Sequence, residues 1–175
     1  MLKFYKIIAT CALLFIVACQ QTIRPAVIPP QMVNVTLNKS GLEIIGGIEP
    51  IYFLPLKAPF QARIDTGAET SSVHVINLYP FERDGEKWVS FDLEKQAKGL
   101  THNFEKRIKR KVIIRRSQKN EYRYVVDMDI KIGKDIINAE FSLADRDKFN
   151  YPALIGRNII SGKYMVDPSV ENTLH

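Results

Sequence analysis

Hydrophobic and polar residues alternate with a period of two along much of the chain. Over residues 121–132, every second position is Tyr, Val, Met or Ile, and the positions between them are mostly charged. Residues 60–65, 89–94 and 137–143 repeat this pattern over shorter lengths. Such alternation is typical of β-strands that bury one face. No stretch of residues 41–167 shows the repeat of about 3.6 residues that marks a long helix.

Turn sequences separate the alternating segments. Asp84-Gly85 and Gly133-Lys134-Asp135 each stand between two such segments, which is the arrangement of a β-hairpin. A short helix is expected at residues 157–161, ended by Gly162, with a closing strand at 163–166. The pattern therefore predicts an all-β domain, a small closed barrel with one short C-terminal helix.

The composition is that of an ordinary globular protein. The chain has 175 residues, of which 46% are hydrophobic and 25% are charged. These values argue against a disordered, collagen-like or coiled-coil protein, and the length fits a single domain. The only cysteines in the sequence are Cys11 and Cys19, which could form one bridge at most. A disulfide scaffold is therefore excluded.

The first 19 residues have the features of an export signal. Two lysines precede an apolar stretch over residues 7–17, which is too short to span a membrane. Ile16-Val17-Ala18-Cys19 resembles a lipobox, in which the cysteine is lipidated after cleavage. We therefore expect a lipoprotein signal peptide at 1–18 and a lipid on Cys19. An ordinary secretory signal with an incidental cysteine is the alternative.

Further boundaries follow from composition. Residues 19–40 contain three prolines and no sustained period, which predicts a flexible tether after the lipidated cysteine. The folded domain is expected at 41–168, with a C-terminal tail at 169–175. Gln20 follows the cysteine, as in lipoproteins of the outer membrane. We therefore expect a protein of the cell envelope, anchored through its lipid and facing the periplasm.

Two short motifs suggest chemistry. Asp65-Thr66-Gly67-Ala68 follows a predicted strand and resembles the active-site loop of aspartic proteases. Alone it is weak, because Asp and Gly are also favoured in ordinary turns. Downstream, an apolar strand leads into Gly156, Arg157 and Asn158, which resembles the second motif of retroviral-type proteases. The two motifs in this order, on an all-β pattern, are more specific than either alone.

Over residues 44–168 the chain resembles the bacterial family of retropepsin-like aspartic endopeptidases, long labelled ATP-dependent zinc proteases. The likeness is carried by residues 62–68, 80–85, 145–147 and 165–168. It implies a barrel of retropepsin-like type. The zinc and ATP of the label find no support in the sequence, which has no HExxH motif, no phosphate-binding glycine loop and three scattered histidines. We expect no metal and no cofactor.

The resemblance also implies a mechanism. Aspartic peptidases use two carboxylates facing each other across a water molecule, where one keeps its proton and the other acts as base. The sequence has one Asp-Thr-Gly, so the second carboxylate would be Asp65 of another subunit in a homodimer. Thr66 would hydrogen-bond across the two-fold axis. Gly67 would admit the substrate backbone, and Ala68 completes the loop.

Other expected site residues come from the same resemblance. Glu69 stands where the family has an acidic residue that contacts the substrate or the downstream arginine, and we predict an ion pair between Glu69 and Arg157. Gly156 and Asn158 would be structural. A flap over the substrate is expected at a polar hairpin tip, for which a plain solvent hairpin is the alternative: Ser117, Gln118 and Lys119.

The chain is basic, with a net charge of +6, and seven of the eleven residues at 106–116 are Lys or Arg. This run could attract an acidic peptide, or it could be a solvated strand face. Nucleic acid is not expected, because the run lacks interleaved aromatic residues. Two functions stay open. One is a homodimeric aspartic peptidase acting on peptides or proteins of the envelope, acidic ones among them; the other is a non-catalytic binding or adaptor lipoprotein. A zinc peptidase is a weaker third.

Overall fold

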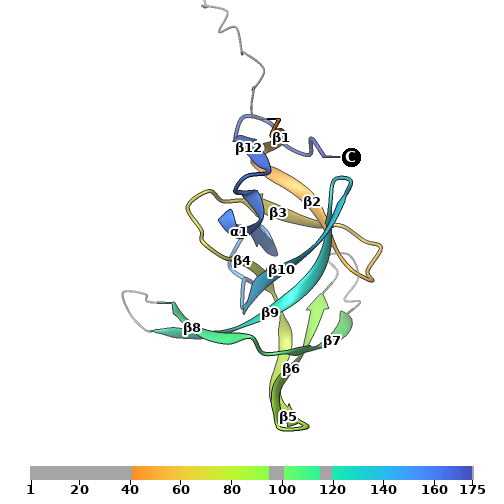
Figure 1. Ribbon diagram of the computed structural model, residues 1–175, viewed down its shortest axis with the longest axis vertical. Coiled ribbons are helices and arrows are strands. Elements are labelled where there is room, and N and C mark those ends of the chain that lie inside the picture. Colours follow the sequence, from red (N-terminus) through yellow and green to blue (C-terminus); the bar gives the residue numbers. More distant parts are fainter. Residues whose placement is uncertain (1–40, 95–100, 115–119, 175) are drawn as a thin grey trace, which may run out of the picture. The chain divides into compact units, whose positions relative to one another are not determined.

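The computed structural model describes residues 41–94, 101–114 and 120–174, and these residues form β-strands and one short helix (Figure 1). The expected signal peptide, Cys19, the expected tether and the flap candidate at 117–119 lie outside the described residues. The elements are β1 (Glu43–Gly46), β2 (Ile48–Phe53), β3 (Phe60–Ile64), β4 (Ser71–His74), β5 (Ile76–Arg83), β6 (Glu86–Glu94), β7 (Thr101–Arg107), β8 (Arg110–Ile114), β9 (Glu121–Ile132), β10 (Asp135–Ala144), β11 (Ala153–Ile155), α1 (Arg157–Ile160) and β12 (Tyr164–Asp167).

Six of the described strands close into a barrel. Their order is β10-β4-β11-β3-β2-β9, and β9 pairs again with β10 to complete the circle. β8 extends the sheet by pairing with the first half of β9. The predicted small closed barrel of retropepsin-like type with one short C-terminal helix is confirmed. The described residues contain no helix long and apolar enough to cross a membrane.

The barrel core follows from the alternating pattern. Val126, Met128, Ile130 and Ile132 of β9 are all at most 1% exposed. These side chains occupy every second position, so they share one face of the strand. The neighbouring strand β2 adds Phe53, whose ring meets two other phenylalanine rings edge to face at centroid distances of 5.2 and 5.3 Å.

The turns between strands lie where the sequence predicts them. Asp84 and Gly85 join β5 to β6 and have φ angles of 52° and 75°, the left-handed conformation that a tight two-residue hairpin requires. Gly133, with φ 55°, begins the turn between β9 and β10. β5, β6 and β7 form a separate antiparallel sheet, visible in Figure 1 as the yellow-green and green strands. Both predicted hairpins are confirmed.

The end of the described chain packs against the barrel. β12 pairs with β1 in parallel, and the segment beyond it reaches Leu174, which is 6% exposed. Glu49, which is fully buried, accepts hydrogen bonds from the N–H groups of Gly46, Thr173 and Leu174 and from the Thr173 hydroxyl. The segment that the sequence analysis sets apart as a tail is therefore docked on the domain through residues 172–174.

Candidate active site

The loop that follows β3 folds around the Asp65 carboxylate. Asp65 Oδ1 accepts hydrogen bonds from the backbone N–H groups of Gly67, at 2.8 Å, and Ala68, at 3.2 Å. A Cβ atom on Gly67 would lie 3.1 Å from the same oxygen, so glycine lets the loop close this tightly. The backbone therefore holds one carboxylate oxygen of Asp65, and the other makes no hydrogen bond to a described residue.

The second predicted motif lies directly beside this loop. β11 runs parallel to β3, and the Asp65 N–H donates to the Ile155 carbonyl oxygen at 2.9 Å. At the start of α1, the Arg157 N–H donates to the Ala68 carbonyl oxygen at 2.8 Å. Two segments that lie some ninety positions apart in the sequence thus share one backbone hydrogen-bond network. The predicted juxtaposition of the two motifs is present.

Asn158 ties the network to the strand after the loop. Its Oδ1 accepts hydrogen bonds from the Ser71 N–H at 2.9 Å and from the Ser71 hydroxyl at 2.8 Å. The same hydroxyl accepts from the Gly156 N–H at 3.0 Å, and Asn158 Nδ2 donates to the Glu140 carbonyl oxygen at 2.9 Å. Asn158 and Gly156 therefore have the structural position expected of them. Ser71, which the sequence analysis did not single out, completes the connection.

The predicted ion pair between Glu69 and Arg157 is not present among the described residues. Arg157 Nη1 donates instead to the carbonyl oxygens of Gly67, at 2.7 Å, and Thr66, at 3.2 Å. The physical reason is the loop itself. Its N–H groups turn inward to Asp65, so these carbonyl oxygens are left facing the arginine. Arg157 still has a structural role, but it acts on the backbone.

Two cavities adjoin the loop. The first, of about 350 Å³, is lined by Asp65, Arg146 and Leu154 among others. The second, of about 410 Å³, lies along Ala68–Thr70 on one side and β8 on the other, and Arg146 and Leu154 line it as well. The two hollows therefore share a wall, and Asp65 stands beside a groove that continues under β8. A groove next to a backbone-held carboxylate can seat an extended peptide.

Three arginines and one acidic residue, Glu69, line the second cavity. Arg110 and Arg123 form ion pairs with Glu140 and Glu121 respectively. Arg146 is 7% exposed and forms no ion pair with any described residue. Its burial and the repulsion of Arg123 lower the pKa of Arg146, and the Asp65 carboxylate partly offsets this. The sequence analysis quoted Arg146 within a motif but assigned it no role.

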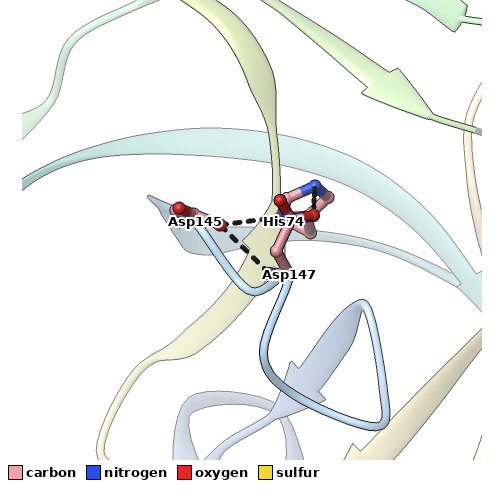
Figure 2. A group of neighbouring side chains, drawn as sticks. All are labelled: His74, Asp145 and Asp147. Carbon is pink, nitrogen blue, oxygen red and sulfur yellow. Dashed lines mark hydrogen bonds and ion pairs between the residues drawn. The ribbon is translucent and has the colours of Figure 1, made fainter.

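The same motif contributes a cluster of His74, Asp145 and Asp147, shown in Figure 2. His74 Nε2 lies 3.3 Å from Asp147 Oδ1, and Nδ1 lies 3.8 Å from Asp145 Oδ1. The Arg146 N–H donates to Nδ1 at 2.8 Å, which leaves the proton of the neutral ring on Nε2. A metal ion on Nε2 would require the other tautomer and would break that bond. The arrangement therefore fits a positioning role better than a metal site.

Comparisons with known proteins agree with this geometry. A family model described as "RimB-like: Retropepsin-like aspartic endopeptidase RimB" matches residues 44–174. Over 130 residues the chain is 39% identical to a probable alpha-L-glutamate ligase of Shewanella pealeana, and over 132 residues it is 41% identical to one of Shewanella halifaxensis. Each match covers 72% of this chain and 28% of the relative, so the chain spans little more than a quarter of these proteins.

A solved structure is similar as well. It is the crystal structure of a Legionella pneumophila protein of unknown function, with 28% sequence identity and a TM-score of 0.66. The match covers 76% of this chain and 98% of that protein.

Proposed function

Because the chain belongs to the RimB-like family of retropepsin-like aspartic endopeptidases, we propose that it is a homodimeric aspartic peptidase. The observation that carries the proposal is the Asp65 carboxylate, held by two backbone N–H groups on a loop that the downstream motif braces. Because the loop already holds the carboxylate in place, little conformational entropy is lost when the carboxylate takes part in a reaction. Peptide-bond hydrolysis is the reaction that this loop performs in its fold family.

Two copies of Asp65 form the reaction centre. Each carboxylate has one oxygen engaged by the loop and the other available to a water molecule. Two carboxylates that face each other across one water molecule share a proton, so one activates the water as a base while the other protonates the substrate carbonyl. Thr66, which is exposed, is placed at the outside of the loop, where it can hydrogen-bond to its counterpart in the partner.

Peptides with acidic side chains are the proposed substrates. The groove beside Asp65 is lined by three arginines against one acidic residue, Glu69, and the exposed Lys148 lines the first cavity. A basic groove raises the local concentration of an anionic chain. The names of the curated relatives refer to alpha-L-glutamate, which supports the same class of peptide.

The cell envelope is the proposed location. The lipobox-like sequence ending at Cys19 would attach the mature protein to a membrane, with the peptidase domain in the periplasm. Labelling of the full chain with a fatty-acid analogue tests this, with Cys19→Ser as the matched control. Lipid that remains on the Cys19→Ser chain would contradict the assignment.

The test of the peptidase is Asp65→Asn. Asparagine keeps an oxygen that can accept from Gly67 and Ala68, so the fold and the dimer should persist while turnover of a quenched glutamate-rich peptide falls at least about a thousandfold. The matched control is Asp84→Asn, in an exposed turn whose positive φ asparagine tolerates. Retained turnover in Asp65→Asn, or activity from a strictly monomeric protein, would overturn the proposal.

A second candidate is a non-catalytic module that binds acidic peptides. It is favoured by the presence of the same domain within chains named as glutamate ligases, where recognition of a peptide could suffice. It predicts equal peptide binding by the unaltered protein and by Asp65→Asn, with no cleavage by either. Cleavage products in the mass spectrum would exclude it.

A further inference from the structure

We infer that Arg146 is a specificity-determining residue that binds a carboxylate of the substrate beside the scissile bond. The inference rests on the proposed function of the Asp65 site. It adds the side chain that recognises an acidic residue of the substrate. Arg146 stands where the two cavities meet, and it is the only arginine that lines both of them among the described residues. A carboxylate bound there would lie in the hollow that Asp65 also lines.

The guanidinium of Arg146 is held by hydrogen bonds that engage two of its three nitrogens. Nε donates to the Tyr151 carbonyl oxygen at 3.2 Å, and Nη1 donates to the Ser72 hydroxyl at 2.9 Å. The Phe149 ring lies 4.6 Å from the guanidinium carbon. Nη2 makes no hydrogen bond to a described residue. The side chain is therefore oriented in advance, with a donor left over for a ligand.

The charge of Arg146 supports the same role. Neighbouring arginines of the groove have carboxylate partners, but Arg146 has none among the described residues although it is 7% exposed. A buried cation without a partner is costly, and a substrate carboxylate would remove that cost on binding. Arginine is suited to this because its fork donates two parallel hydrogen bonds to one carboxylate.

His74 fixes the backbone that carries Arg146. The Arg146 N–H donates to His74 Nδ1, and Asp145 and Asp147 flank the same ring (Figure 2). His74 ends β4, the strand that begins at Ser71, beside the Asp65 loop. The guanidinium and the catalytic carboxylate are thus attached to one rigid scaffold. The subsite formed by the Arg146 guanidinium should therefore recognise the side chain at one position of the substrate, at a constant distance from the scissile bond.

The experiment measures binding in Asp65→Asn, so that no turnover occurs. Fluorescein-labelled hexaglutamate and its six variants with a single glutamine are titrated by fluorescence anisotropy. We expect glutamine to weaken binding roughly ten- to hundredfold at one position, or at two neighbouring ones, and about threefold or less elsewhere. Adding Arg146→Gln should abolish the difference between positions, whereas Arg107→Gln, which removes the same charge on β7 away from both cavities, should preserve it.

Each outcome either supports or contradicts the assignment of Arg146. A uniform loss at all six positions would mean long-range attraction only and would overturn the inference, as would position dependence that survives in Arg146→Gln. If Arg146→Gln does not fold, Arg146→Lys takes its place. It keeps the charge but loses the fork, so the loss of binding caused by glutamine at the preferred position should fall to about threefold or less, as at the other positions.

Cleavage assays of the unaltered protein with the same seven peptides, set beside the binding data, separate this inference from the proposed function. Position-specific binding without any cleavage by the unaltered protein would end the peptidase proposal and leave the subsite standing. Cleavage of hexaglutamate and its glutamine variants at equal rates, with no position-specific binding, would end the subsite and leave the peptidase standing.

Discussion

Gly156 lies so close to Ala68 that a Cβ atom on residue 156 would be 2.9 Å from the Ala68 carbonyl oxygen. It would also be 3.0 Å from the Thr70 carbonyl carbon. Both neighbours are backbone atoms, which cannot move aside as the end of a side chain can. The backbone N–H of Gly156 also donates to the Ser71 hydroxyl. The two motifs therefore contact each other through main chain, and the absence of a side chain at residue 156 permits this contact.

Gly156→Ala should destabilise the domain and reduce turnover. The added methyl group must push the Asp65 loop away from α1, at a cost of about 1–3 kcal/mol in the free energy of unfolding. Urea denaturation followed by circular dichroism measures this cost. Gly47→Ala is the matched control, because its Cβ would meet the nearest atom, Pro168 Cα, at 3.4 Å. Equal stability of the two variants would contradict the proposed close contact.

Asn158→Ala should cost about 1–3 kcal/mol of unfolding free energy, because it leaves the Ser71 N–H and the Glu140 carbonyl oxygen without their side-chain partner. Thermal and urea denaturation measure the loss. Asn138→Ala removes an exposed amide whose partner is the side chain of Asp129, and it should change stability by no more than about 0.5 kcal/mol. A smaller effect for Asn158 than for Asn138 would show that the motif is not structural.

Arg157→Lys should lower kcat/KM about ten- to hundredfold. Arg157 donates from one nitrogen, Nη1, to both the Thr66 and the Gly67 carbonyl oxygens. The shorter lysine side chain, with its freely rotating ammonium, does not hold a donor at this position, so the Asp65 loop loses its outer support. Steady-state kinetics with the quenched peptide measure the change.

A double-mutant cycle checks whether Glu69 takes part. Because Arg157 contacts backbone and not Glu69, the coupling between Glu69→Gln and Arg157→Lys in unfolding free energy should stay within about 0.5 kcal/mol. A larger favourable coupling would reinstate the ion pair that the structure lacks.

Stability should fall in mild acid because of Glu49. Burial alone would raise the pKa of Glu49, but hydrogen bonds from Thr173, Leu174 and Gly46 outweigh it and hold the pKa below its ordinary value of 4.5. The folded state thus favours the ionised form. Its contribution is complete above pH 4.5, where the unfolded chain is also ionised, and is lost as the pH falls through the lower folded pKa.

Glu49→Gln should remove this part of the pH dependence. It should also lower the free energy of unfolding by about 1.5–3 kcal/mol at neutral pH. Both carboxylate oxygens of Glu49 accept hydrogen bonds, whereas an amide has only one acceptor oxygen. Unfolding free energies measured at a series of pH values test both effects. Glu94→Gln, at the exposed end of β6, is the matched control. A pH profile that is the same in Glu49→Gln and in the unaltered protein would contradict the assignment.

Much of the fold could be predicted from short patterns of residues in the sequence. The alternation over residues 121–132 and the turns at Asp84-Gly85 and Gly133 each depend on a few adjacent side chains. Their structural consequences are the same in any protein. The resemblance then brought Asp65 and Arg157 into one site, because both motifs are short and contiguous.

What the sequence by itself determined is therefore mostly local: which segments are strands and where they turn. The meeting of the two motifs, some ninety positions apart, was expected from the family resemblance. The tertiary structure decided the rest. Arg146 meets Ser72 across 74 positions, and Glu49 meets Thr173 across 124. No local rule selects such partners, because burial and charge compensation depend on which strands become neighbours when the barrel closes. The same holds for Arg157, whose choice of backbone carbonyls over Glu69 depends on how the Asp65 loop turns its N–H groups inward.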